Sequence, residues 1–408
     1  MNKLFFIPLV IVLLLGLILA GCGPSTPAPS TTAAPPPSTT AKPPASTTTA
    51  APPPTTTAAP PTTTAAPPPT TAAPQPMTLT FNGAQFGAND VPGQTYNWFC
   101  NEVTKRTNGL IKFNYVGSNS LTKPGEEITA LQKGLADVGA FSMVYYPAQM
   151  YVNSGFNRAI PFDSTDVDLQ TKVIYKLYYD DPTTSKILQD EFAKQGLKFL
   201  SMTVDDSYVI ETKAQVVTLD DMKGKKLAVL GYEGKFFGPT GAVVQGMPVG
   251  DRGTALQTGV IDGAATPWEI SFPFRLYEFA PYMIQSGFGC VTGNGITWNT
   301  DKFNKLPKNV QDIIVQVGKD AFMNNAIVTA NWYKTALDTR AKATGNKPYL
   351  NFSADDMAKW ANLVGEPVLD WLKDAQSKNI VGAKEVITRF IALEKEAGFK
   401  FPKEFKTE

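Results

Sequence analysis

Between residues 77 and 300, short apolar runs alternate with stretches in which apolar residues recur every three or four positions. The short runs predict strands at 79–81, 110–116, 138–144, 197–204 and 226–230. The longer pattern predicts a helix that carries Tyr96, Phe99, Cys100 and Val103 on one face, and another from 169 to 195. Strands that alternate with helices indicate an α/β fold with mainly parallel strands.

After Trp298 the pattern becomes helical, and it predicts helices at 310–342, 354–377 and 383–397. Ser353 followed three residues later by Asp356 is typical of a capping box at the start of the second of these helices. We expect the long C-terminal helices to brace the rest of the fold.

One phrase occurs twice in the folded part of the chain. Residues 129–137 read Thr-Ala-Leu-Gln-Lys-Gly-Leu-Ala-Asp, and residues 254–262 read Thr-Ala-Leu-Gln-Thr-Gly-Val-Ile-Asp. Each copy is interpreted as a helix end, a glycine in the left-handed conformation and a buried strand. Two copies predict two similar lobes with a ligand-binding cleft between them. Chance similarity between common residue types is the alternative.

The N-terminus has the features of a secretory signal. Lys3 precedes an apolar run from 4 to 19, which ends in Ala20, Gly21 and Cys22. The ending resembles the bacterial lipobox, which implies removal of the signal peptide 1–21 and acylation of Cys22. The alternative is an uncleaved membrane-spanning anchor. Either interpretation places the remaining chain outside the cytoplasm and attached to a membrane.

Residues 22–76 consist mostly of Thr, Pro, Ala and Ser, with Lys42 as the single charged residue. Such a composition offers too little apolar surface to offset the entropy of ordering the chain. We expect a disordered tether between the membrane and the lobes.

The chemistry available to the chain is limited. Its net charge is +1 and it contains no histidine. The charge argues against nucleic acid as a partner, and the missing histidine excludes Ser-His-Asp catalysis and histidine-ligated metals. We therefore expect no enzyme activity, no cofactor and no metal site. The adjacent acids Asp205 and Asp206 are interpreted as a solvated turn. Cys100 and Cys290 are expected to be separate buried thiols, although a disulfide is allowed outside the cytoplasm.

Aromatic residues follow both copies of the repeat. Tyr145 and Tyr146 come shortly after the first copy, and Trp268 comes at a similar distance after the second. Ligands of open α/β sheets lie beyond the carboxyl ends of strands. We therefore predict one aromatic platform from each lobe in the cleft, with ordinary core packing as the alternative.

Five segments, in order, resemble the solute receptors of tripartite ATP-independent periplasmic (TRAP) transporters. They are residues 117–139, 160–162, 219–229, 255–263 and 299–307, and the resemblance extends from 77 to about 402. It implies a two-lobed periplasmic-binding-protein-like fold with crossing strands. Lobe I would comprise 77–204 plus about 287–320, and lobe II 205–286 plus about 321–408 with the bracing helices. It also implies capture of a small organic acid and its delivery to a small and a large membrane subunit.

The chain departs from that family at the site. The usual carboxylate-pairing arginine falls at Ala228, and the Asn that often precedes Pro falls at Thr266. Alanine cannot grip a carboxylate as a guanidinium does. We rank Lys235 first as a replacement cation, before Arg275, Arg252 and Arg158, and leave a metal ion open. The predicted ligand-binding residues are Tyr145, Tyr146, Ala228, Lys235, Thr266 and Trp268.

With at most one cation, an aromatic-lined pocket favours a monocarboxylate, an aromatic or oxo acid, or a neutral ligand over a dicarboxylate such as succinate. Two other functions remain open. One is the solute-binding lipoprotein of an ATP-driven importer, and the other is a ligand-binding surface protein without a role in transport.

Overall fold

The computed structural model describes residues 75–408. The predicted signal peptide, the predicted lipidation at Cys22 and the predicted tether up to residue 74 lie outside these residues.

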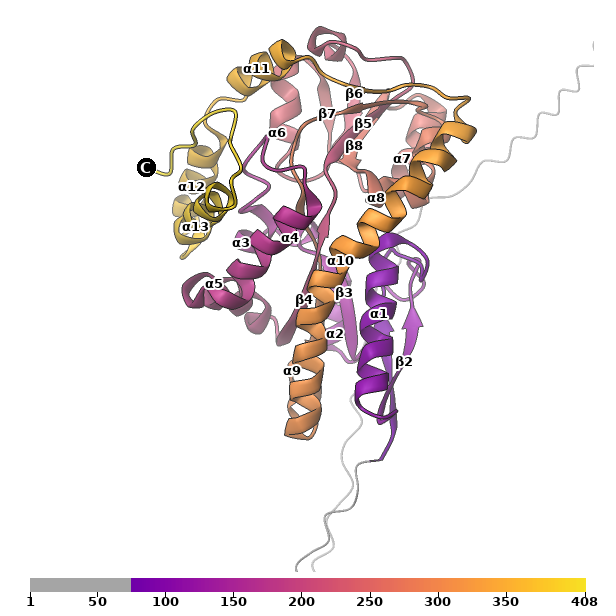
Figure 1. Ribbon diagram of the computed structural model, residues 1–408, viewed down its shortest axis with the longest axis vertical. Helices are drawn as coiled ribbons and strands as arrows, with labels where there is room; N and C mark the ends of the chain where they lie inside the picture. The colour runs from indigo at the N-terminus through magenta and orange to yellow at the C-terminus, as the bar shows by residue number, and fades with distance from the viewer. Residues whose placement is uncertain (1–74) are drawn as a thin grey trace, which may run out of the picture. The chain divides into compact units, whose positions relative to one another are not determined.

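Two sheets form the centres of two lobes (Figure 1). Lobe I is built on the strand order β2-β1-β3-β10-β4, with β1 (Met77–Asn82), β2 (Ile111–Val116), β3 (Val138–Ser142), β4 (Leu197–Asp205) and β10 (Val291–Asn299). Lobe II is built on the order β11-β9-β5-β8-β6-β7, with β5 (Tyr208–Thr212), β6 (Lys226–Ala228), β7 (Val243–Gln245), β8 (Gly263–Pro267), β9 (Tyr282–Gln285) and β11 (Tyr349–Asn351). The predicted two-lobed α/β fold is confirmed.

Two direct connections between strands join the lobes, one from β4 to β5 through Asp206 and Ser207, and the other from β9 to β10. The strands that arrive from the other lobe, β5 and β10, are antiparallel to both of their neighbours. Such a strand starts at the cleft and runs away from it, whereas strands such as β1, β3, β6 and β8 end at the cleft. The sheets are therefore mixed, and the expectation of mainly parallel strands holds only outside the crossing strands.

Helices surround the two sheets. Their bounds are α1 (Val91–Arg106), α2 (Glu127–Gln132), α3 (Tyr151–Gly155), α4 (Val167–Tyr175), α5 (Pro182–Lys194), α6 (Gly234–Phe237), α7 (Val249–Thr258), α8 (Trp268–Ser271), α9 (Thr300–Asn304), α10 (Lys308–Ala343), α11 (Ala354–Leu363), α12 (Pro367–Ser377) and α13 (Ala383–Glu396). The 36-residue α10 runs across the molecule and packs on α1 and β4 of lobe I before it reaches lobe II (Figure 1). This confirms the predicted bracing role for the first of the C-terminal helices.

Two of the predicted helices are each broken into two. The predicted helix 169–195 is interrupted at Asp181, because the residue before Pro182 is disfavoured in the helical conformation. Asp181 has φ −91° and ψ 110°, and its side chain accepts hydrogen bonds from the backbone N–H groups of Thr183 and Thr184 to cap α5. The predicted helix 354–377 breaks at Gly365, which has φ +67°, and resumes as α12 at Pro367. Ser353 caps α11 as predicted, since its hydroxyl accepts from the N–H of Asp356 at 3.0 Å.

The repeated phrase forms the same structure twice. Gly134 and Gly259 have φ of +74° and +76°, and each separates a helix from a strand. The equivalence extends to the last residue of the phrase. A carboxylate oxygen of Asp137 accepts from the N–H of Thr80 at 2.7 Å, and one of Asp262 accepts from the N–H of Lys226 at 2.9 Å. Each Asp thus ties its helix–strand turn to the neighbouring parallel strand, so the interpretation as a structural repeat is confirmed.

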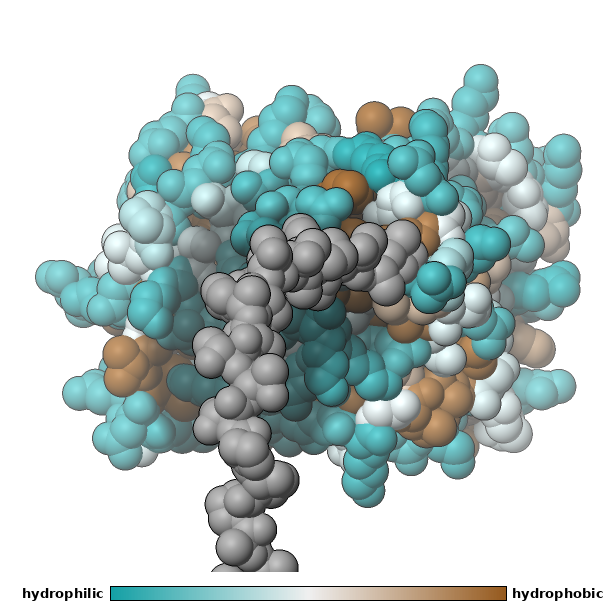
Figure 2. Space-filling view, turned by 90° about the horizontal axis from the view of Figure 1, so that it is seen from below, coloured by the Kyte–Doolittle hydropathy of each residue, from teal (hydrophilic) through white to brown (hydrophobic). Residues whose placement is uncertain are grey.

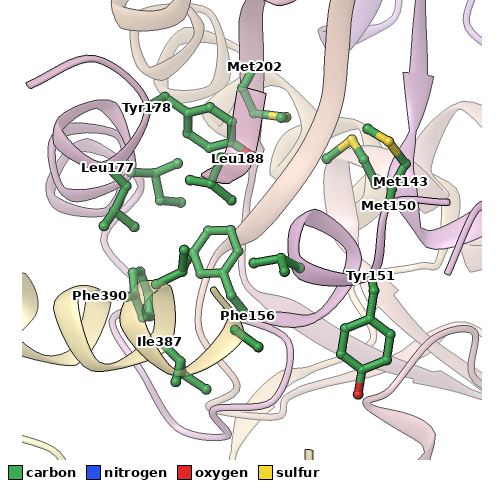
Figure 3. Close-up of a cluster of buried hydrophobic side chains, with 14 of the residues drawn as sticks. Met143, Met150, Tyr151, Phe156, Leu177, Tyr178, Leu188, Met202, Ile387 and Phe390 are labelled. Carbon is green, nitrogen blue, oxygen red and sulfur yellow. The ribbon is translucent and has the colours of Figure 1, made fainter. Parts of the chain in front are cut away.

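The largest apolar cluster joins lobe I to the last helices. Phe156 packs edge to face on Phe390 of α13, with ring centroids 5.5 Å apart (Figure 3). Tyr151 stacks on Trp371 of α12 at the same centroid distance of 5.5 Å. Helices α12 and α13 therefore pack on lobe I side chains, although the sequence analysis grouped them with lobe II. The exact lobe boundaries stay a prediction, because the described residues belong to one compact unit.

Three further features bear on the expectations from the sequence. Within residues 75–408, no helix combines the length and apolar character needed to cross a membrane. Cys100 and Cys290 are buried and not linked to each other, which confirms the expectation of separate thiols. On the face shown in Figure 2, hydrophilic residues predominate and hydrophobic residues form small separate patches.

Candidate ligand-binding site

A narrow cavity lies between the lobes at the carboxyl ends of strands from both sheets. Its volume is about 40 Å³, which is room for only a few water molecules. Lobe I contributes Gln85, Phe86, Ser142, Val144, Tyr145, Arg158, Asp205 and Asn294, and lobe II contributes Tyr208, Leu230, Val249, Arg252, Thr266, Pro267 and Ile270. A molecule held here contacts both lobes at once.

The cation that lobe I supplies is matched by an anion from lobe II. Nη1 of Arg158 lies 2.6 Å from Oε1 of Glu233 and donates to the hydroxyl of Tyr208 at 3.0 Å. Nη2 donates to the carbonyl of Thr292 at 2.7 Å. Burial is the largest single influence and lowers the pKa of the Arg158 guanidinium, but the charges of Glu233 and Asp205 and the hydrogen bond to Glu233 act together with Tyr208 against it, and the net shift of the pKa is upward. The positive charge of Arg158 is therefore neutralised within the protein.

The cation that lobe II supplies has no such partner. Arg252 in α7 is 1% exposed. Its Nε and Nη2 donate to the carbonyl of Met247 at 3.1 and 3.0 Å, and its Nη1 donates to the carbonyl of Ala265 at 3.2 Å. Among residues 75–408 it has no carboxylate oxygen within the 4.0 Å limit of an ion pair. Burial lowers the pKa of Arg252, as expected for a desolvated cation.

Buried carboxyls gather where β4 passes into lobe II. Asp205 lines the cavity and is 4% exposed, and Asp206 and Glu269 are buried beside it. Burial raises the pKa of Asp205 to about 7, although the charge of Arg158 acts against this shift. Burial is the main cause that raises the pKa of Glu269, and the charges of Asp206 and Asp205 raise it further. The Oε2 atom of Glu269 accepts a hydrogen bond from the hydroxyl of Thr329 at 2.9 Å. The interpretation of Asp205 and Asp206 as a solvated turn is therefore wrong, because both side chains are buried and Asp206 accepts from the backbone N–H of Glu269 at 3.2 Å.

Two of the predicted site residues, Tyr145 and Thr266, line this cavity. Tyr145 follows β3 and Thr266 lies near the end of β8, so both stand at the strand ends where ligand contacts were expected. Burial raises the pKa of Tyr145 to about 12, so its hydroxyl remains protonated and can donate a hydrogen bond near neutral pH. The predicted aromatic contribution from lobe I is thus present in the cavity as Tyr145.

Tyr146 and Trp268 lie elsewhere and have the packing role that was the alternative. The hydroxyl of Tyr146 donates to the Glu127 carboxylate inside lobe I. Trp268 is fully buried, with its ring centroid 5.6 Å from that of Phe272 and 5.3 Å from that of Trp332 in α10. Helix α8 begins at Trp268, and the indole ring of Trp268 packs on α10 rather than at the cavity.

The remaining predicted residues also lie outside the cavity lining. Ala228 is fully buried in β6 opposite Ala264 of β8. Lys235 is exposed on α6, with its ammonium 4.1 Å from the ring centroid of Tyr232. Arg275 is exposed and pairs with Glu278. Of the four candidate replacement cations, the structure brings only Arg158 and Arg252 to the cavity, and Lys235, which was ranked first, is not among them.

Sequence reasoning missed Asp205, although a signal was present. Asp205 directly follows the predicted strand 197–204, and this is the position at which ligand contacts are expected in an α/β sheet. The neighbouring Asp206 favoured the solvated-turn interpretation instead. Gln85 likewise follows β1 and was not identified.

Solved structures with the same fold are TRAP solute-binding proteins. One from Rhodoferax ferrireducens in complex with copurified benzoate has a TM-score of 0.68 and 21% identity, and the match covers 79% of this chain and 98% of that one. A marine metagenome protein in complex with 3-hydroxybenzoate has a TM-score of 0.67 and 21% identity, over 79% of this chain and 99% of that one.

Sequence relatives and a family match agree with these structures. The C4-dicarboxylate-binding periplasmic protein DctP of Rhodobacter capsulatus is 22% identical over 290 residues, which are 70% of this chain and 83% of that protein. Residues 83–374 match the family described as bacterial extracellular solute-binding protein, family 7. The resemblance to TRAP receptors is confirmed, and the chain belongs to bacterial extracellular solute-binding protein family 7.

Proposed function

We propose that this protein is an extracytoplasmic receptor that captures a small organic acid between its lobes and delivers it to the membrane subunits of a TRAP transporter. The observation that carries the proposal is the cavity at the strand ends of both lobes, which contains a buried guanidinium from each of them. A buried cationic site favours an anionic ligand, because the ligand supplies the charge that desolvation makes unfavourable to leave unpaired.

Related proteins support the same ligand class. Solved TRAP solute-binding proteins of this fold hold benzoate, 3-hydroxybenzoate, pyroglutamate and succinate. These ligands share a carboxylate and differ in the rest of the molecule. A carboxylate-binding site combined with a variable second half of the cavity accounts for that range. For this chain we propose a monocarboxylate, including aromatic and oxo acids.

The location is part of the proposal. The signal sequence and lipobox motivate a protein held outside the cytoplasm by a lipid on Cys22. The family match favours neither a receptor of an ATP-driven importer nor a surface protein without a transport role. Neighbouring genes for one small and one large multi-span membrane protein would support the TRAP assignment, and genes for an ATPase subunit would contradict it.

A ligand screen tests the capture of organic acids. The purified full-length protein would be heated with benzoate, 3-hydroxybenzoate, pyroglutamate, branched 2-oxo acids and succinate, and each hit measured by calorimetry. We expect at least one monocarboxylate to raise the melting temperature and to bind with a stoichiometry of one. A screen in which sugars or polyamines bind and none of the acids does would overturn the proposal.

A further inference from the structure

Arg252 and Ala228 lie beside the same short stretch of β8. Ala228 is the register partner of Ala264, and Nη1 of Arg252 donates to the carbonyl of the next residue, Ala265. The resemblance described above assigns carboxylate pairing to an arginine at position 228, which is alanine here. A guanidinium therefore reaches this part of the sheet from helix α7 instead of from strand β6.

We propose that Arg252 binds the carboxylate of the ligand and so replaces the arginine missing at position 228. This inference rests on the proposed function and names the residue that performs it. A guanidinium has five N–H donors, and three of those of Arg252 are used by the carbonyls of Met247 and Ala265. The two that remain sit one on Nη1 and one on Nη2. A carboxylate that accepts from one N–H on each of these two nitrogens is held by both of its oxygens.

The other groups around Arg252 do not neutralise it. Glu211 is the carboxyl that acts on the guanidinium through its charge, but it forms no ion pair with it within 4.0 Å in the described chain. Tyr145 and Tyr208 keep their protons near neutral pH, because burial raises the pKa of each hydroxyl. Burial itself raises the pKa of Glu211 to about 7, so this carboxyl is an incomplete counter-charge near neutral pH. Arg340 also donates only to backbone carbonyls, of Lys347, Pro281 and Pro348, but it does not line the cavity.

The charges in the cavity also specify the rest of the ligand. Arg158 is occupied by Glu233, Tyr208 and Thr292, which leaves Arg252 as the cation available for a carboxylate. Asp205 faces the same cavity, and its carboxylate accepts a long hydrogen bond of 3.4 Å from the hydroxyl of Thr203. In its ionised form Asp205 repels a second ligand carboxylate nearby, whereas a hydroxyl or ammonium group of the ligand can donate to it. The ligand is therefore a monocarboxylate that carries a hydroxyl or amino group.

Matched ligands test this class on the unmodified, full-length protein. One series is benzoate, 3-hydroxybenzoate and isophthalate, and another is butyrate, 3-hydroxybutyrate and succinate. In the series that fits the cavity, we expect the hydroxy acid to bind roughly tenfold or more tightly than both the parent acid and the diacid. The uncharged amide of the best acid is expected not to bind. An amide that binds as tightly as its acid would overturn the assignment of a carboxylate site.

Variants then test Arg252 itself. With the best acid of these series as the probe, Arg252→Ala is expected to weaken binding roughly 100-fold or more. Arg252→Lys is expected to weaken binding by less, because lysine keeps the positive charge but lacks the paired N–H donors of a guanidinium. Arg340→Ala is the matched control, since it removes a buried arginine held by carbonyls outside the cavity, and it should leave the affinity unchanged. If Arg252→Ala does not fold, Arg252→Lys decides the question, and unaltered affinity in that variant contradicts the bidentate contact.

The two proposals fail in different ways. If acids bind the unmodified protein and both Arg252 variants retain that affinity, the role of Arg252 is wrong and the receptor function stands. If no acid binds the unmodified protein, the receptor function falls, and the assignment of Arg252 falls with it.

Discussion

Arg158 of lobe I and Glu233 of lobe II join the two lobes through an ion pair, with 2.6 Å between Nη1 and Oε1. The hydroxyl of Tyr208 donates to the same carboxylate oxygen at 2.8 Å. Both charged side chains are buried, at 5% and 2% exposure, so solvent screens the pair very little. Contact between the lobes is therefore stabilised by groups of the protein itself.

We expect Glu233→Gln to change which acids bind. The variant leaves Arg158 with an uncompensated charge in the cavity, and a second ligand carboxylate can supply the missing anion. Calorimetry should show that the affinity for succinate rises about tenfold or more relative to that for butyrate. Glu278→Gln, which removes the exposed partner of Arg275, is the control and should change neither affinity. A constant ratio of the two affinities in Glu233→Gln would show that Arg158 does not become available to ligands.

Ligand binding is expected to draw the lobes together. The crossings at 206–207 and 286–290 are short connections that can serve as hinges between the sheets. Small-angle scattering of the protein saturated with its best acid should give a smaller radius of gyration than scattering without the acid. Arg252→Ala at the same acid concentration should show no decrease. A radius that stays constant at saturation would argue for a rigid pair of lobes.

Stability is expected to fall as the pH rises. Burial raises the pKa of Glu211 to about 7 from the usual value of 4.5. The folded state therefore holds a proton on Glu211 that the unfolded state releases at lower pH, and this contribution is lost between about pH 4.5 and pH 7. For Glu211 alone the loss is on the order of 3 kcal/mol. Asp205 acts in the same direction, since burial raises its pKa to about 7.

Urea denaturation at pH 5 and pH 8 checks this expectation. Glu211→Gln should reduce the difference in the free energy of unfolding between the two pH values. Glu385→Gln, which changes an exposed carboxylate, should leave the difference as it is in the unmodified protein. A free energy of unfolding that increases from pH 5 to pH 8 would contradict the sign of the effect.

Substitutions of Trp268 and Tyr145 are expected to have different effects, with the first lowering the stability of the protein and the second weakening ligand binding. Trp268→Ala removes a fully buried ring that packs on Phe272 and Trp332, and should lower the free energy of unfolding by about 3 to 5 kcal/mol. The affinity of the folded variant for acids should stay the same. Tyr145→Ala should weaken acid binding with a smaller loss of stability, because Tyr145 lines the cavity. The reverse pattern in calorimetry and thermal unfolding would restore Trp268 as a binding residue.

Membrane attachment is expected to depend on Cys22. Cys22→Ser should leave the protein unprocessed or release it from the membrane fraction, and the melting temperature of the lobes should not change. Labelling with a radioactive fatty acid, followed by phase partitioning, measures both effects. Equal labelling of the variant and the unmodified protein would remove the lipoprotein assignment.

Features that depend on local sequence could be predicted. The repeat was found because a glycine stop and a buried strand follow each helix within nine residues, and α10 was found because its apolar period continues for over thirty residues. The helix breaks just before Pro182 and Pro367 also had a local signal, namely the prolines themselves, but the continuous apolar periodicity of the two segments obscured it.

The site depends on contacts that are remote in sequence. The burial of Asp205 requires β4 to pair with β10, which lies more than eighty residues later. The choice between Arg252 and Lys235 requires the packing of α7 beside β8 and the exposure of α6. Neither can be derived from a pattern of neighbouring residues, and for this reason Lys235 was ranked above Arg252.

The long helix α10 is attached to both lobes, so relative motion of the lobes during ligand binding acts on this helix. Asn325 holds it to lobe I, because its Nδ2 donates to the carbonyl of Val204 at 2.8 Å. Thr329 holds it to lobe II through Glu269. These two attachments are four residues apart, which is about 6 Å along the helix. A separation of the lobes that keeps both hydrogen bonds must therefore bend or stretch a single helical turn, which stores elastic energy. The elastic stiffness of that turn enters the binding constant of every ligand that closes the cleft.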